Sequence, residues 1–177
     1  MKLFYLLIIV ITSYTAKAQG QIQEFFRDTY KTKVFYGDGI LSSDRLDDVL
    51  KILDKDTISG LPGISERKII LTTDEKAYIL TEVKKLLEVS QYDYLKNIKG
   101  FTYQKKPSRR KKIKEYRYIS KPVFFRDDTF CLLYDERMLQ SKSTGFAGTG
   151  GIGGWELYEK QDGVWKHTLM LSTWIQN

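Results

Sequence analysis

The stretch that decides the fold lies in the last third of the chain. Residues 116–138 read YRYISKPVFFRDDTFCLLYDERM, two runs of aromatic and β-branched residues around Asp127-Asp128. Such runs favour strands, and Asp tolerates the positive φ angles of a tight hairpin turn. The apolar run Phe130–Tyr134 is typical of a central strand that is covered on both faces. Pro122 cannot donate to a ladder, so the first strand should lie at an edge or break there.

Two further strands complete the predicted sheet. They flank Gln161-Asp162-Gly163, in which glycine supplies the left-handed geometry of a turn. By period-two counting, His167 shares a face of the last strand with Trp165 and Leu169. The sequence therefore predicts a C-terminal antiparallel meander of about four strands. They are Tyr116–Arg126, Thr129–Met138, Trp155–Lys160 and Val164–Ile175.

The N-terminal half shows helical spacing instead. Apolar side chains recur every three to four residues in 21–30 and in 44–53, the second with Ser43 as a candidate N-cap. Thr72 and Glu75 have the spacing of a capping box before a third helix. We expect an α+β fold in which these N-terminal helices pack on one face of the C-terminal sheet, around a single hydrophobic core.

Two segments between the helices carry weaker signals. Val34–Tyr36 is predicted as a short strand, because an aromatic and β-branched run precedes a glycine-rich turn. Residues 92–103 show neither period and are predicted to be irregular. The chain contains no internal repeat, so residues 19–177 are predicted to form one domain.

Residues 1–18 have the order of a signal peptide. Lys2 precedes the apolar run Leu3–Ile11, and Ala16-Lys17-Ala18 supplies small residues for cleavage. The run is much shorter than the roughly 20 residues that span a bilayer as a helix. We expect an extracytoplasmic mature chain, periplasmic or secreted, with no transmembrane segment after cleavage. An uncleaved N-terminal anchor is the alternative.

The positive charge is concentrated in one segment. The chain carries a formal net charge of +7, and residues 105–114 contain seven cations and no acid. At its centre, Arg109, Arg110, Lys111 and Lys112 are candidates for binding an anionic envelope ligand or an acidic protein. The run lacks the interleaved aromatic residues that stack on bases, so no nucleic acid partner is expected. The alternative is a solvated linker.

A glycine cluster precedes the third predicted strand. Gly148, Gly150 and Gly151, together with Trp155, are candidates for close backbone approach to a ligand. No Gly-Lys-Ser/Thr follows, and Trp155 begins a strand rather than a helix, so neither nucleotide-binding glycine motif fits. The alternative is a long flexible connection between two strands.

The residues of common catalytic and metal sites are scarce. His167 is the single His, and Cys131, the single Cys, lies in an apolar run typical of a buried, inert thiol. One His and one Cys argue against a tetrahedral zinc site. Asp135 and Glu136 are strand neighbours that point to opposite faces. We therefore predict no catalytic residue, no metal and no other cofactor.

Several short motifs occur in an order that resembles small, uncharacterised bacterial secreted proteins. They are Ser120-Lys121-Pro122-Val123-Phe124, the glycine cluster, Leu157-Tyr158-Glu159-Lys160, Asp162-Gly163-x-Trp165 and Trp174-Ile175. The resemblance implies export and a similar architecture, and it supplies no catalytic residue.

Together these features favour a non-enzymatic extracytoplasmic binding module that engages a protein or cell-envelope ligand. Two alternatives stay open. One is an enzyme that acts on an envelope polymer through carboxylates that only the fold brings together, and the other is a neutraliser of a secreted toxin. A concave cleft with two inward carboxylates would favour the enzyme, and a flat face with hydrophobic patches would favour the binding module.

Overall fold

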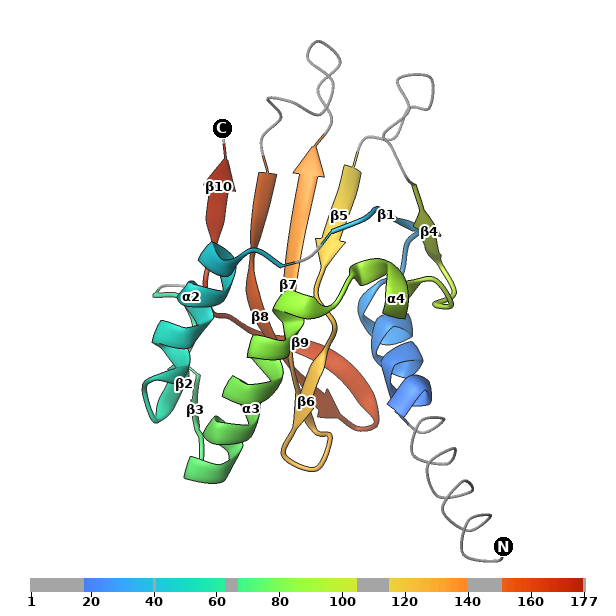
Figure 1. Ribbon diagram of the computed structural model, residues 1–177. Coiled ribbons are helices and arrows are strands. Elements are labelled where there is room, and N and C mark those ends of the chain that lie inside the picture. The colour runs from blue at the N-terminus through green and yellow to red at the C-terminus, as the bar shows by residue number, and fades with distance from the viewer. Residues whose placement is uncertain (1–17, 40, 63–66, 105–114, 140–150, 177) are drawn as a thin grey trace, which may run out of the picture.

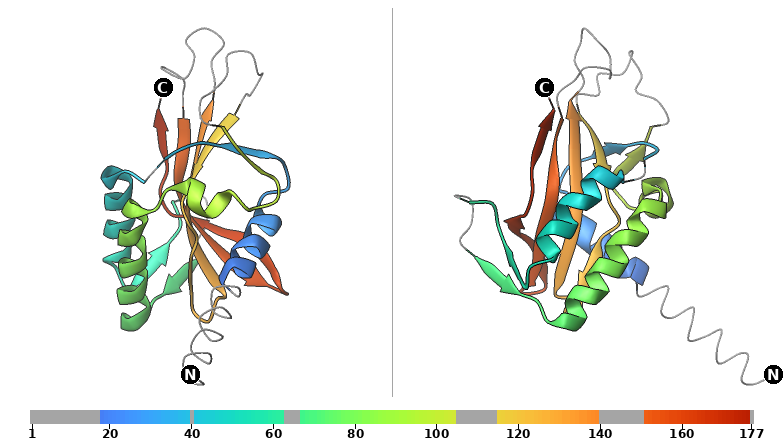
Figure 2. Two further views of the ribbon diagram at one scale, coloured as in Figure 1. Left: turned by 45° about the vertical axis from the view of Figure 1, so that its right-hand side comes forward. Right: turned by 60° about the vertical axis from the view of Figure 1, so that its left-hand side comes forward.

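The computed structural model is an α+β structure, an eight-stranded mixed sheet with helices on both faces (Figures 1 and 2). It describes residues 18–39, 41–62, 67–104, 115–139 and 151–176. After an N-terminal helix over residues 18–29, the elements are β1 (Val34–Tyr36), α2 (Ser43–Leu53), β2 (Thr57–Ser59), β3 (Lys68–Ile70), α3 (Thr73–Lys85), the short helix η1 (Leu86–Glu88), α4 (Gln91–Leu95), β4 (Phe101–Tyr103), β5 (Glu115–Ile119), β6 (Val123–Phe125), β7 (Phe130–Leu139), β8 (Gly151–Gln161), β9 (Val164–Met170) and β10 (Trp174–Gln176).

Two long central strands, β7 and β8, organise the sheet (Figure 1). Shorter strands flank them in succession: β5 and then β6 pair with β7, while β9 and then β10 pair with β8. Beyond β5, the parallel strands β1 and β4 extend the sheet, whose order is β10-β8-β7-β5-β1-β4. The prediction of a simple four-stranded antiparallel meander is therefore wrong, because strands from the N-terminal half join the sheet and make it mixed.

Two of the predicted strands are each divided in the structure. The first breaks around Pro122, as predicted, and the break separates β5 from β6. Strand β5 lies between β1 and β7, whereas β6 pairs with β7 alone among the described strands. The last divides between β9 and β10, where the N–H groups of Leu171 and Ser172 both donate to the Trp155 carbonyl, at 2.8 and 3.5 Å. In both cases one long partner strand continues past the break, and the sequence alone does not reveal that partner.

The turn predictions are confirmed by the backbone angles. Asp127 and Asp128 have φ of 51° and 61°, and Arg126 before them has 51°. In the β8–β9 turn, Asp162 and Gly163 have φ of 53° and 77°. Asp and Gly therefore occupy the left-handed positions that these hairpins require.

Helices cover both faces of the sheet, which corrects the prediction of one covered face and one core. On one face, α2 and α3 pack Val49 and Val83 into a cluster with Leu132 of β7. On the other, the N-terminal helix packs Phe25 into a second cluster with Leu133. Alternate residues of β7 belong to the two clusters, and every residue of Phe130–Tyr134 is buried, which confirms the central-strand prediction.

The helices also alternate with strands rather than preceding the sheet. Strand β1 lies between the first two helices in the chain, and the antiparallel pair β2 and β3, a separate two-stranded sheet, lies between α2 and α3. Residues 92–103, predicted to be irregular, contain most of α4 and all of β4. The prediction missed α4, which follows its N-cap Ser90 and is anchored by buried Gln91. The Gln91 amide donates to Gly37 O at 2.7 Å and accepts from Ile119 N at 3.1 Å.

The capping box of α3 is confirmed and ties the helix to the sheet. Thr72 Oγ1 accepts from the Glu75 N–H at 3.2 Å, and Glu75 Oε2 accepts from the Thr72 N–H at 2.9 Å. Arg126, in the β6–β7 turn, donates to both oxygens of the same carboxylate, at 2.6 and 2.8 Å. The bond from Arg126 is the main reason that the pKa of Glu75 falls to about 2.

Within the described part of the chain, no helix combines the length and apolar character needed to cross a bilayer.

Candidate functional site

A polar hollow of about 360 Å³ lies on the sheet face that the N-terminal helix covers, beyond the end of that helix. Residues 29–32, the last residue of the helix and the three that follow it, form one wall, and β5, β7 and β8 contribute the floor. Further along the same face, Ile152 and Ile175 are exposed, at 41% and 70%. The N-terminal helix therefore leaves part of this sheet face uncovered, and the hollow lies where the helix ends and the uncovered part of the face begins.

Register brings charged side chains from three strands to this face. Arg117 of β5 is the cross-strand partner of Arg137 of β7, which in turn pairs with Ile152 of β8. Asp135 and Glu156 point the same way, because each lies an even number of residues from a member of this row. All five residues line the hollow.

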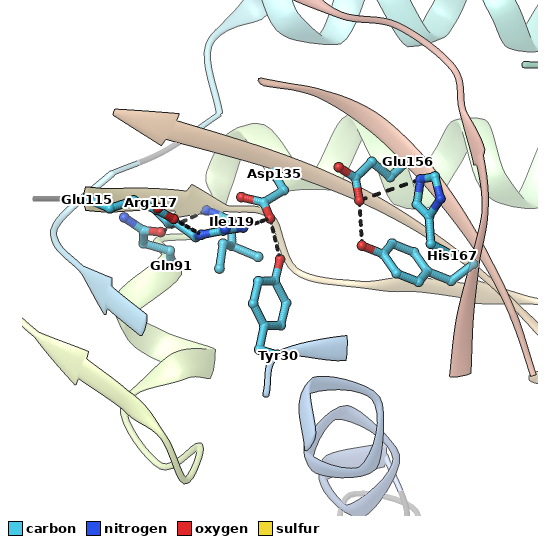
Figure 3. A network of polar contacts seen from close by, with 9 residues as sticks. Tyr30, Gln91, Glu115, Arg117, Ile119, Asp135, Glu156 and His167 are labelled. Atoms are coloured by element: carbon cyan, nitrogen blue, oxygen red, sulfur yellow. Dashed lines mark hydrogen bonds and ion pairs between the residues drawn. The ribbon is translucent and has the colours of Figure 1, made fainter. Parts of the chain in front are cut away.

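Asp135 is the most buried charged side chain in the hollow, with 7% exposure. Its Oδ2 accepts from the Tyr30 hydroxyl at 2.7 Å and from Arg117 Nη1, while Arg117 Nε donates to Glu115 at 2.7 Å (Figure 3). Its Oδ1 is buried and has no hydrogen-bond partner among the described residues. Burial raises the pKa of Asp135 to about 6, although Arg117 and Tyr30 both act to lower it.

Glu156 forms the second acidic position. Its Oε2 accepts from the Tyr158 hydroxyl at 2.5 Å and lies 3.9 Å from His167 Nε2 (Figure 3). Burial raises the pKa of Glu156 and lowers that of His167. The imidazole is therefore largely neutral near pH 7, and its contact with Glu156 is a weak one at this distance.

The position of His167 corrects the period-two prediction for the last strand. Leu157 pairs with Leu169 but Tyr158 pairs with His167, so Thr168 is an extra residue in β9. Trp165 and Leu169 consequently belong to the two opposite cores rather than to one face. A bulge reverses the alternation downstream of it, and the sequence carries no clear mark of this one.

Arg137 is the one arginine of the hollow that forms no salt bridge among the described residues. Its side chain is exposed and lies opposite Arg117 across the strands. Directly opposed like charges destabilise a sheet. Glu115 and Asp135 form salt bridges with Arg117, whereas Arg137 acts on Glu156 at longer range, where its charge lowers the pKa of that carboxyl against the larger effect of burial.

The prediction that Asp135 and Glu136 do not act as a pair agrees with the geometry. Glu136 lies on the opposite face of β7, where it accepts from the Tyr134 hydroxyl at 2.9 Å. The acid that shares the hollow with Asp135 is Glu156, from the neighbouring strand. Sequence reasoning missed it because only the β7–β8 register joins the two. The available signal was Asp135 itself, an acid directly after five apolar residues of a central strand.

Two of the predicted ligand-binding residues have clear structural surroundings. A Cβ atom on Gly151 would lie 2.8 Å from Trp174 Cη2, so the missing side chain makes room for that indole. Trp155 is fully buried and donates from Nε1 to the Arg45 carbonyl of α2 at 2.7 Å. Arg109, Arg110, Lys111, Lys112, Gly148 and Gly150 lie outside the described residues.

The chemistry of the hollow is that of acids, guanidinium groups and hydroxyls. Cys131 is buried on the same side of the sheet, and burial raises the pKa of its thiol well above the usual value. In the described residues no three His, Cys, Asp or Glu side chains are grouped so that they could hold a metal ion. The geometry therefore provides a concave surface with charges of both signs, including two carboxyl groups whose pKa values are raised.

Comparison with protein-family models, with curated proteins and with solved structures gives no match for this chain.

Proposed function

We propose that this chain is an exported binding module and that the polar hollow is its binding site. The expected partner is a polar group of a protein or of a cell-envelope ligand. A toxin-neutralising role would be one form of such protein binding. The export rests on the signal-peptide pattern of residues 1–18.

The observation that carries this proposal is the convergence of charged groups in a concave site in which one guanidinium group is exposed. Arg137 forms no salt bridge among the described residues, and it shares the hollow with Glu156, a partly exposed carboxylate that its charge influences. Pockets that combine apolar walls with a few convergent polar groups are the usual form of a ligand site. Clusters of perturbed carboxyl groups in a concave site point the same way.

Affinity capture from an envelope fraction tests the proposal. The baits are the unaltered protein, an Arg137→Gln/Glu156→Gln variant, and a matched Arg27→Gln/Glu88→Gln control with the same charge changes at exposed positions outside the hollow. We expect the hollow variant alone to lose the captured ligand. A fourth bait with Arg109 to Lys112 replaced by Ser separates the hollow from the basic run. Equal capture by the unaltered and hollow-variant baits would contradict the proposal.

A second candidate function, an enzyme acting on an envelope polymer, is favoured by one specific observation. Asp135 and Glu156, both with raised pKa values, face the same hollow from adjacent strands. A protonated carboxyl and an ionised one are the groups that glycoside hydrolysis uses as acid and as base or nucleophile. Release of soluble fragments from isolated envelope polymer, abolished by Glu156→Gln and by Asp135→Asn, would support it. Release that both variants leave unchanged would reject this role for the two acids.

A further inference from the structure

We propose that the group bound in the hollow is the carboxyl-terminal end of a peptide whose last side chain is apolar. This inference rests on the proposed function, because it names the chemistry that the same site recognises. Three neighbouring features of the hollow fit three parts of such an end: the carboxylate, the last amide N–H and the last side chain.

The carboxylate fits the paired arginines. Arg117 and Arg137 lie directly opposite each other on β5 and β7, with their Cβ atoms roughly 5 Å apart by the geometry of such pairs. Guanidinium groups bind carboxylates through two parallel hydrogen bonds, which fixes the orientation of the bound group. A carboxylate between the two arginines would also reduce the repulsion between their facing charges.

The amide N–H fits Glu156. Both contacts of this carboxylate, from Tyr158 and His167, involve Oε2, so Oε1 is available to accept a hydrogen bond. The side chain is 16% exposed, so the donor of a bound ligand can reach it. A peptide supplies that donor next to its terminal carboxylate, whereas a fatty acid has no N–H to offer.

The apolar side chain fits the far wall. Ile152 and Met170 line the hollow beside Arg137 and Glu156, and Ile175 extends the apolar surface because it pairs with Ile152 across β8 and β10. An exposed isoleucine pair next to an arginine pair matches an apolar group adjoining a carboxylate.

The volume and the charge of the hollow favour a short peptide end over a polymer or a phosphate group. At about 360 Å³ the hollow is near the lower end of the range for ligand pockets, so it takes one or two residues rather than a polymer. The cations Lys31, Arg117 and Arg137 are matched by Asp135, Glu156 and Glu115, the second partner of Arg117, so the site carries little net charge. Such a site suits a singly charged carboxylate better than a phosphate dianion.

Calorimetric titration of the purified protein with small probes tests the inference. The probes are N-acetyl-Gly-Leu with a free carboxyl group, its carboxyl-terminal amide, octanoate and inorganic phosphate. We expect the free acid to bind at least about tenfold more tightly than the other three, since the amide lacks the charge and the last two lack the N–H donor. An amide that binds equally well, or tighter binding of octanoate or phosphate, would overturn the inference.

Single substitutions test whether the peptide acid binds in the hollow. Arg137→Gln should weaken the free acid about tenfold, while the matched Arg27→Gln control should bind as the unaltered protein does. Because Arg137 is exposed and faces Arg117, its variant should keep or slightly raise the urea midpoint, which separates loss of binding from loss of folding. Ile152→Thr should weaken N-acetyl-Gly-Leu but leave N-acetyl-Gly-Gly unchanged, and equal loss for both would count against the apolar wall.

Failure of this inference and failure of the proposed function give different results. If no peptide acid binds while capture from the envelope still depends on Arg137 and Glu156, the proposed site stands and its ligand is not a peptide end. If capture is also independent of these two residues, both conclusions fall.

Discussion

Asp135 gives the protein an unusual dependence of stability on pH, which Asp135→Asn should remove. The pKa of this carboxyl is raised from 3.8 to about 6 in the folded chain. The folded state therefore holds the proton more tightly than the unfolded chain does. The resulting stabilisation is fully present below about pH 4 and is lost as the pH rises through about 6. At 1.36 kcal/mol for each pKa unit, the loss amounts to about 3 kcal/mol.

Other groups near the hollow make a comparison with the variant necessary. The pKa values of Glu136 and Glu156 are also raised, mainly by burial, so they act in the same direction as Asp135. The lowered pKa of His167 acts in the opposite direction near pH 6, as does that of Glu75 below about pH 4.5. The difference between the unaltered protein and Asp135→Asn isolates the contribution of the one carboxyl.

Urea unfolding followed by tryptophan fluorescence measures this difference at a series of pH values from 4 to 7.5. We expect the free energy of unfolding of the unaltered protein, relative to the variant, to fall by about 3 kcal/mol over this range. A relative stability that stays constant or rises with pH would refute the reasoning. A rise would show that the bonds from Arg117 and Tyr30 outweigh burial, as they do for most salt-bridged carboxylates.

Three further predictions concern the scaffold around the site. Gly154→Ala should destabilise the protein by more than about 2 kcal/mol, measured in urea, because the added Cβ would lie 1.8 Å from the Ser172 carbonyl oxygen; an unchanged midpoint would contradict this. Gln91→Met should cost about 2–3 kcal/mol, since it leaves the Ile119 N–H and a buried carbonyl unpaired; a cost below about 0.5 kcal/mol would mean that water replaces the amide. Cys131 should react with a thiol reagent only at the rate of unfolding, because it is fully buried and its pKa is raised; rapid reaction of the folded protein would show that β7 opens locally.

The sequence predicted correctly those elements that depend on a few adjacent residues. The Thr72 capping box, the Asp127-Asp128 turn and the central strand over Phe130–Tyr134 all follow from a few adjacent residues, and the structure confirms them. The parallel pairing of β1 with β4 and β5 joins residues far apart in the chain. Nothing in a three-residue strand such as Val34–Tyr36 specifies its partner.

The candidate site was hidden for a related reason. Its acids lie on adjacent strands that a long connection separates, so their meeting depends on the register of β7 with β8. In the sequence, the acid next to Asp135 is Glu136, which points to the opposite face. Glu156 becomes a neighbour of Asp135 only through the pairing of Leu133 with Glu156 across β7 and β8. The surface features that do stand out in the sequence, the basic run and most of the glycine cluster, fall outside the described residues.

The change of character along β7 supports a binding role for the hollow. Its first five residues are apolar on both faces, and the next three, Asp135, Glu136 and Arg137, are all charged. On the face of the N-terminal helix, the switch occurs where the helix ends. If the second half of β7 only had to be compatible with solvent, neutral polar residues at these positions would be enough. Here a carboxyl is buried instead, with one oxygen unpartnered among the described residues, and its raised pKa reflects how strongly burial disfavours the ionised form. Proteins tolerate such local instability mainly at functional sites, which is why we propose the hollow as the ligand site.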